Sequence, residues 1–215
     1  MLDAESTWRR PAYVRQGEGM SAPSDATAGS RPDAASDARA RPVTGVREAS
    51  AEDWPAIWPI VEEVVRAADT FAYDPAMGEA DARAGWLEMP RRVVVAVRDG
   101  VVVGTANMYA NRPGPGSHVA SGSIMVDRAV RGSGAGRALV RDMIAWAARE
   151  GFAAIQFNAV VDTNAAAVHL YESLGFVTLG VAPGAFRHPE LGDVGLRIMW
   201  RDLSDLPDAA TGGEG

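Results

Sequence analysis

The residues best suited to chemistry form one cluster, Arg-Gly-Ser-Gly-Ala-Gly-Arg at positions 131–137, between a short apolar strand and a predicted helix. Its three glycines, Gly132, Gly134 and Gly136, allow the backbone to approach a ligand closely and to adopt positive φ. A helix that starts in such a loop aims unpaired N–H groups and the positive end of its dipole at the ligand. The cluster therefore predicts a site for a phosphate or diphosphate group.

The spacing within the loop narrows the choice of ligand. A Walker loop requires a lysine, and the sequence contains none. The dinucleotide pattern G-x-G-x-x-G fails because its last position falls on Arg137 or Leu139. The pattern Arg131-x-x-Gly134-x-Gly136 resembles the R/Q-x-x-G-x-G/A loop of the GCN5-related N-acetyltransferases. Taken alone, the motif also allows an ordinary strand-to-helix turn.

A second motif follows in the order that this family shows. The segment Asn164-Ala-Ala-Ala-Val-His-Leu-Tyr171-Glu-Ser-Leu-Gly175-Phe176 is similar to the family's N-x-x-A-x-x-x-Y-x-x-x-G-F, with Ala167 also matching. The resemblance covers residues 43–201. It implies an α+β fold, in which helices flank a mixed, largely antiparallel central sheet with a splayed strand pair. It also implies acetyl-coenzyme A as the cofactor.

The resemblance implies a set of cofactor contacts. Successive loop amides would bind the pyrophosphate, and the strand before the loop would present backbone groups to the pantetheine arm. A main-chain N–H near Met125 or Val126 would polarise the acetyl carbonyl. Arg131 and Arg137 would supplement the loop amides, with solvated helix-end charges as the alternative. The expected cofactor-binding residues are Met125, Val126, Arg131, Gly132, Ser133, Gly134, Ala135, Gly136, Arg137 and Asn164.

Two residues are candidates for catalysis, Tyr171 and Asn158. The resemblance implies that Tyr171 is the general acid that protonates the coenzyme A thiolate, although its helix face also suits a core tyrosine. Asn158 interrupts an apolar strand, where a buried amide needs partners. Phe157-Asn158-x-Val160 resembles a subgroup that includes fungal acetyltransferases acting on proline analogues, which places Asn158 near the acceptor. A satisfied sheet amide is the alternative.

The acceptor side is less determined by the sequence. Phe71 and Tyr73 lie in a loop and could line an apolar slot. Residues 183–189 read as a Pro-flanked loop, in which Arg187 could pair with a substrate carboxylate and His188 could be a weak base or exposed. The strand at 118–126 carries no carboxylate, so the sequence names no general base.

The elements that must position these residues follow from periodicity and turn signals. Helices are expected after Ser50, at 79–88, from the glycine loop to Gly151, and at 164–175. Strands are expected at 43–48, 92–97, 101–109, 118–126, 154–161, 176–180 and 196–201. The transferase domain is therefore expected at 43–203, between disordered tails at 1–42 and 204–215.

Composition excludes several classes of protein. The net charge of −7 and the absence of a basic stripe argue against nucleic-acid binding. The sequence has no cysteine and its three histidines are scattered, so a metal site is not expected. No membrane-spanning or secretory segment appears, which predicts a cytoplasmic protein. Translation could start at Met1 or at Met20.

The sequence thus predicts an N-acetyltransferase that transfers acetyl to an amine of a small molecule by direct attack in a ternary complex. Acetylation of a protein N-terminus or lysine is one alternative. A non-catalytic acyl-coenzyme A-binding regulatory module is another. A homodimer is expected because dimers are common in the resembled family.

Overall fold

The computed structural model describes residue 43 and residues 45–206. The predicted tail at 1–42, and residues 207–215 of the predicted tail at 204–215, lie outside this part of the chain. Residues 204–206 belong to the described part, and the Leu206 side chain packs against the main hydrophobic core.

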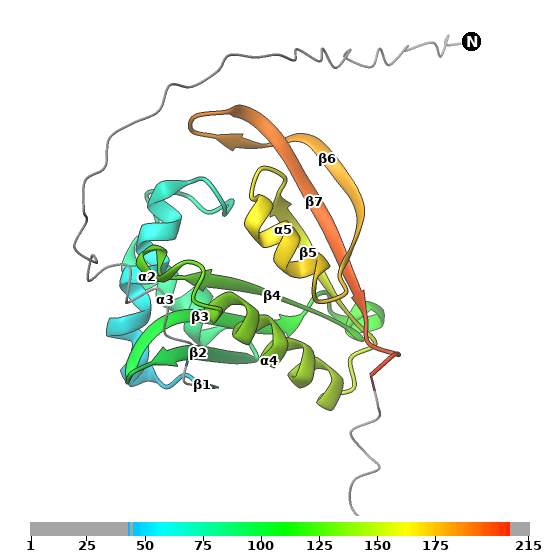
Figure 1. Cartoon of the computed structure of the whole chain (residues 1–215), viewed down its shortest axis with the longest axis horizontal. Helices are drawn as coiled ribbons and strands as arrows, with labels where there is room; N and C mark the ends of the chain where they lie inside the picture. Colours follow the sequence, from blue (N-terminus) through cyan, green and yellow to red (C-terminus); the bar gives the residue numbers. More distant parts are fainter. Residues whose placement is uncertain (1–42, 44, 207–215) are drawn as a thin grey trace, which may run out of the picture. The chain divides into compact units, whose positions relative to one another are not determined.

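A single mixed sheet organises the described chain, with the strand order β1-β2-β3-β4-β5-β7-β6 (Figure 1). All neighbouring strands pair antiparallel except β4 and β5, which are parallel. This arrangement confirms the predicted fold class. The strands are β1 Gly45–Glu48, β2 Arg92–Arg98, β3 Val101–Ala110, β4 Val119–Val126, β5 Ala154–Val161, β6 Val177–His188 and β7 Gly192–Asp202.

Helices cover both faces of the sheet. Helices α2 (Trp54–Ala67) and α3 (Glu79–Arg83) lie on one face, and α4 (Ala135–Arg149) and α5 (Ala165–Glu172) lie on the other. Strand β2 shows why the sheet is buried on both sides. Val93 and Val95 pack with α2, whereas Val94 and Ala96 pack with α4, as the two-residue period of a strand requires.

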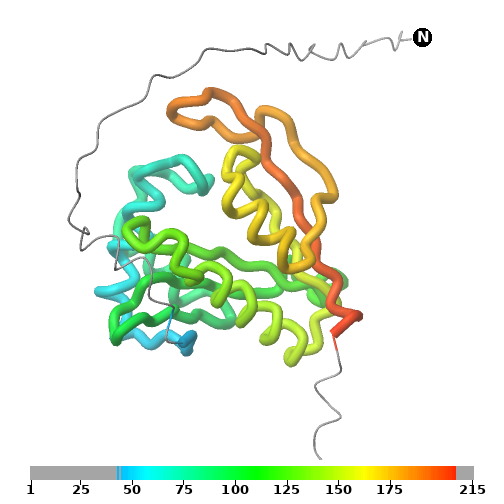
Figure 2. The backbone as a smooth tube through the Cα atoms, in the orientation of Figure 1, coloured from blue at the N-terminus to red at the C-terminus, as the bar shows by residue number. Residues whose placement is uncertain are grey.

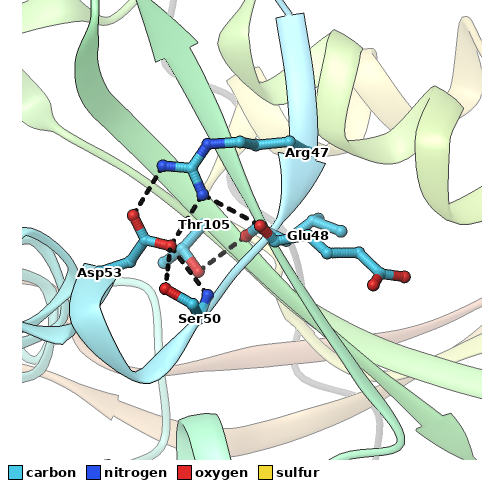
Figure 3. A network of polar contacts seen from close by, with 6 residues as sticks. Arg47, Glu48, Ser50, Asp53 and Thr105 are labelled. Atoms are coloured by element: carbon cyan, nitrogen blue, oxygen red, sulfur yellow. Dashed lines mark hydrogen bonds and ion pairs between the residues drawn. The ribbon is translucent and has the colours of Figure 1, made fainter.

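A polar network ties β1 to the start of α2 (Figure 3). The Arg47 guanidinium donates to both Asp53 carboxylate oxygens, at 2.7 and 2.8 Å, and the Ser50 N–H donates to Asp53 at 2.8 Å. The bond from Arg47 is the main cause that lowers the pKa of Asp53 to about 2. The short helix η1 (Ala51–Asp53) is thereby fixed against the edge of the sheet.

The predicted helix at 79–88 is confirmed in its bounds, but its second half is π-helical rather than α-helical. After α3 the chain forms a π-helical turn, η2 (Ala84–Glu88), in which the Met89 N–H donates to the Ala84 carbonyl at 3.0 Å. The wider turn sends Trp86 into the core, where its indole N–H donates to the Thr105 hydroxyl at 3.1 Å. Tertiary packing of one tryptophan therefore overrides the local helical period.

The predicted loop at 183–189 is wrong, because residues 183–188 of this segment belong to strand β6. Strand β6 is the edge strand of the sheet, so Pro183 interrupts no ladder that a central strand would need. The register with β7 shifts between Ala182 and Phe186, which accommodates the proline and Gly184. Strands β6 and β7 are therefore longer than their predicted segments at 176–180 and 196–201.

Candidate active site

The functional site lies where β4 and β5 separate. The two strands pair only at Val119–Ala154 and Ala120–Ile155, and beyond these residues they diverge. Figure 2 shows the β5–β7 part of the sheet turning away from the β1–β4 part. A cavity of about 630 Å³ fills the divergence and extends to the glycine loop, to α5 and to the loop at 70–73. The parallel pair therefore confirms the predicted splayed strands.

The cavity has two halves on opposite faces of the sheet. Ile124 and Val126 pack with the core under α4 and α5, whereas Met125, which alternates with them, packs with α2. We call the side toward the glycine loop the α5 half, lined by Val126, Arg131, Gly134, Gly136, Asn164 and Leu170. We call the other side the α2 half, lined by Thr70, Phe71, Tyr73, Tyr109, Ser121 and Ser123.

The glycine loop presents free amides to the α5 half. Gly132 and Gly134 have φ of +83° and +85°, conformations in which a side chain would be strained. The first helical bond of α4, from the Ala138 N–H to the Gly134 carbonyl at 3.0 Å, leaves the amides of residues 135–137 without intrahelical acceptors. No side chain caps this end of the helix. The loop can therefore hold an anion.

Three side chains of this loop region support the same conclusion. The Ser133 hydroxyl is buried and has no hydrogen-bond partner among residues 45–206, which marks it as an unsatisfied group. The Ser133 backbone N–H donates to the Val130 carbonyl at 3.1 Å, so it is not available to a ligand. Arg137 lines the cavity and donates to the Ser173 hydroxyl of the α5 C-cap at 2.8 Å. Arg131 lines the cavity and is exposed, so both guanidiniums flank the free amides.

Strand β4 turns alternate backbone groups into the split. The Asp127 N–H bonds to the Val103 carbonyl at 3.0 Å and the Ser123 N–H to the Asn107 side chain at 3.0 Å, so odd-numbered residues face β3. The backbone groups of the even-numbered residues, including Val126, consequently face the gap toward β5. Met125, expected together with Val126 as a backbone ligand, turns its own amide toward β3.

Tyr171 lies on the side of α5 that faces the cavity. Its ring packs against Phe157 and Phe176, with centroid distances of 4.6 and 5.8 Å. Burial in this cluster raises the pKa of the Tyr171 phenol to about 12. The hydroxyl consequently stays protonated at every physiological pH and is available as a hydrogen-bond donor.

Asn158 lies at the register shift of β5 and belongs to a chain of amides. The expectation of a buried amide is wrong, because the Asn158 side chain is exposed at the split. The Gln156 side-chain N–H donates to Asn158 Oδ1 at 2.7 Å, and Asn158 Nδ2 donates to Asn111 Oδ1 at 2.7 Å. A longer contact of 3.5 Å joins Nδ2 to the Ser121 hydroxyl. The chain spans the split from β5 to the end of β3, so Asn158 closes one wall of the α2 half.

The predicted aromatic pair forms the opposite wall. Phe71 and Tyr73 stack with a centroid distance of 5.8 Å and an interplanar angle of 5°. Burial is the main cause that raises the pKa of Tyr73, and a hydrogen bond with Ser123 opposes it. The loop is held at its base by Asp69, whose carboxylate accepts from Arg128 at 2.6 Å just before the glycine loop.

Arg187 and His188 do not line the cavity. The Arg187 side chain is 87% exposed and pairs with Asp193 of β7 at 3.0 Å. The His188 ring nitrogen Nδ1 accepts the N–H groups of Glu190 and Leu191 in the turn after β6. Both contacts follow from the β6–β7 ladder, which the sequence pattern concealed. Among the predicted loop residues, Ser133 and Ala135 also lie outside the lining.

Four polar lining residues escaped the sequence analysis: Tyr109, Ser121, Ser123 and Thr70. Ser121 and Ser123 alternate with apolar neighbours in the predicted strand, so a polar stripe on one face was visible in principle. Tyr109 pairs with Ser121 across β3 and β4, which only the register reveals. Asn111, the partner of Asn158, lies far from it in sequence and gave no signal.

Comparison with known proteins is consistent with this geometry. A model described as the acetyltransferase (GNAT) family matches residues 45–176. A GCN5-related N-acetyltransferase from Kribbella flavida is 57% identical, with a TM-score of 0.71, and the match covers 74% of this chain and 96% of that chain. The structure of yncA from Salmonella typhimurium, with its cofactor acetyl-CoA, is 28% identical with a TM-score of 0.66, covering 76% and 97%.

A fungal relative matches over a shorter segment. N-acetyltransferase aca1 of Schizosaccharomyces pombe is 34% identical over 86 residues, which span 40% of this chain and 41% of that protein.

In the part of the chain that the structure describes, no helix is long and apolar enough to cross a membrane. No group of metal-ligating side chains occurs in the same residues.

Proposed function

We propose that this chain, which belongs to the acetyltransferase (GNAT) family, transfers acetyl from acetyl-coenzyme A to an amine of a small molecule. The observation that carries the proposal is the continuity of the split between β4 and β5 with the glycine loop, within a single cavity. Such a cavity can hold a long phosphate-bearing thioester at one end and an acceptor at the other.

The residues of the α5 half fit the cofactor. The free amides of residues 135–137, the positive φ of Gly132 and Gly134 and the flanking arginines suit a pyrophosphate. Asn164 caps α5 by accepting the Ala167 N–H at 3.2 Å, and its side chain also lines the cavity. Acetyl-coenzyme A supplies an activated acetyl group when it binds.

Two groups of the chain would assist acetyl transfer, the Val126 N–H and the Tyr171 hydroxyl. The Val126 N–H faces the split, where it can donate to the thioester carbonyl and stabilise negative charge on that oxygen. The uncharged acceptor amine would attack the carbonyl carbon, so that a C–N bond forms and the C–S bond breaks. The nitrogen would release one proton to solvent, and the departing thiolate would take up one proton from solvent to become the free thiol. Tyr171 donates its phenolic hydrogen bond to the departing sulfur. No covalent enzyme intermediate is required, so attack occurs in a ternary complex.

Several features support a small acceptor. The α2 half is enclosed between the aromatic pair of the 70–73 loop and the amide chain of Asn158, with Tyr109 nearby. Large apolar rings with a few convergent polar groups are typical of small-molecule sites. A protein N-terminus or lysine would enter through the same opening and is the competing acceptor.

The experiment has two parts. Calorimetry should detect binding of acetyl-coenzyme A, and a Gly134→Val variant, strained at φ +85°, should lose at least tenfold in affinity while α4 folds normally. Free-thiol release should then be measured across small amines and across peptides with free N-termini or lysines. Failure to bind the cofactor refutes the proposal. Binding with no thiol release on any amine indicates a regulatory binding module instead.

A further inference from the structure

The α2 half of the cavity is polar but uncharged. Its lining contains the hydroxyls of Tyr73, Tyr109, Ser121 and Ser123, together with the amide of Asn158. Arg131 and Arg137 are the charged side chains that line the cavity in the described part of the chain, and both lie in the α5 half. The acceptor end therefore offers many neutral hydrogen-bonding groups and no counter-charge.

The charged groups nearest in sequence to this half have partners and do not line it. Arg112 donates to the carbonyl and the Oδ1 of Asn111 at 2.8 and 3.1 Å, and Asp74 accepts the Ala76 N–H at 2.8 Å. Asp69, next to Thr70, pairs with Arg128 at 2.6 Å. Asp162, which ends the β5 side of the split, pairs with Arg197 at 2.6 Å. Arg187, predicted to receive a substrate carboxylate, pairs with Asp193 and does not line the cavity.

The neutral groups are also placed to receive a ligand that carries donors and acceptors. The Ser121 residue is only 2% exposed. Its hydroxyl accepts a long hydrogen bond of 3.5 Å from Asn158 Nδ2. Asn158 presents both an amide N–H and a carbonyl oxygen, each of which has one short contact at 2.7 Å and spare capacity. The stacked rings of Phe71 and Tyr73 line the same half, and the Tyr73 hydroxyl forms a hydrogen bond with Ser123.

We propose that the acceptor is an amine without a carboxylate, with an apolar or aromatic body and a neutral hydrogen-bonding group such as a carboxamide or hydroxyl. This inference rests on the proposed acetyl transfer and specifies its substrate class. A carboxylate bound in this half would lose part of its hydration without contacting a lining cation, which is unfavourable. A neutral amide would instead pair with Asn158 and the serine hydroxyls.

The same neutrality affects the amine itself. No lining residue of the α2 half supplies a negative charge to the protonated ammonium form, and desolvation favours the uncharged amine that can attack. The chamber therefore selects neutral nucleophiles by exclusion of charge. Strand β4 contains no Asp or Glu. An acceptor that arrives uncharged needs no carboxylate base on this strand.

Matched acceptors test the inference. We expect kcat/KM for L-phenylalaninamide to exceed that for L-phenylalanine by at least roughly tenfold, because the two differ in a carboxylate. Phenethylamine, which lacks the carboxylate but is about as basic as the free amino acid, controls for amine basicity and should also exceed L-phenylalanine. Equal or better use of L-phenylalanine would overturn the inference.

A charge introduced into the chamber gives a second, independent test. Tyr73→Arg places a guanidinium on the 70–73 loop, and Tyr73→Gln is its neutral control. The arginine variant should shift the ratio of L-phenylalanine to L-phenylalaninamide turnover toward the acid by roughly tenfold relative to the glutamine variant. An unchanged ratio would show that the distinguishing group does not bind in the α2 half. Thiol release from no amine at all would instead refute the acetyl transfer.

Discussion

Replacement of Tyr171 by phenylalanine tests the assignment of the catalytic donor. The substitution removes one oxygen and keeps the ring, so the contacts with Phe157 at 4.6 Å and Phe176 at 5.8 Å persist. We expect the free energy of unfolding at neutral pH to change by less than about 1 kcal/mol, because no buried volume is lost. Any large loss of activity then belongs to the hydroxyl.

The size of that loss follows from the pKa of the phenol. At a pKa of about 12, the phenol is far less acidic than a thiol with an ordinary pKa near 8.5. Complete proton transfer to a thiolate is then uphill by roughly 5 kcal/mol, at about 1.4 kcal/mol per pKa unit. Tyr171 would therefore act mainly by hydrogen bonding to the departing sulfur, and kcat should fall about 10²-fold, the lower end for acid catalysis.

The pH dependence gives the decisive readout. Because the pKa is raised above its ordinary value of 10, the wild-type phenol keeps its proton through pH 10. The rate of thiol release at saturating acetyl-coenzyme A should be measured between pH 9 and pH 10.5 for the wild type and for Tyr171→Phe. The two pH profiles should have the same shape over this range. A tyrosine-dependent limb near pH 10, or a Tyr171→Phe variant with wild-type kcat, would refute the reasoning.

Three further predictions concern stability and positioning. Gly122→Ala should lower the free energy of unfolding by about 1–3 kcal/mol, because the new Cβ would lie 2.3 Å from a β3 carbonyl oxygen; Gly45→Ala, with open space, is the denaturation control. Asp53 has a folded pKa of about 2 and an ordinary value of 3.8, so its stabilisation is complete above pH 3.8 and is lost as pH falls toward 2. Asp53→Asn should abolish that acid-dependent component, about 1 kcal/mol given the exposed partner, and an unchanged acid melting profile would contradict this. Asp69→Asn should raise the acceptor KM several-fold without changing cofactor affinity, since the pair with Arg128 holds the aromatic loop; a change confined to cofactor binding would contradict it.

Local signals in the sequence were sufficient for the elements of the α5 half. Glycines at alternating positions before an amphipathic stretch require a turn with positive φ, and Gly132 and Gly134 adopt it. The position of Asn164 before a helical run indicates an N-cap, and its side chain caps α5. Such features depend on residues close together in the chain, which is why a single sequence reveals them.

The α2 half depended on tertiary structure. The register between β3 and β4 decides which backbone groups of β4 face the split. It turns the Val126 N–H toward the split and the Met125 N–H toward β3. The neighbours of Asn158, from Asn111 to Ser121, come together only because β4 and β5 part after two residue pairs. Arg187 appeared free in sequence, but the β6–β7 ladder places Asp193 opposite it.

The sequence by itself therefore determined the family, the mixed fold and the glycine turn before α4, because each depends on residue spacing within local segments of the chain. Tertiary structure alone decided which groups line the α2 half and that none of the described lining side chains there is charged. The physical reason is that cross-strand register and strand divergence bring distant residues together, and neither leaves a periodic trace in the chain.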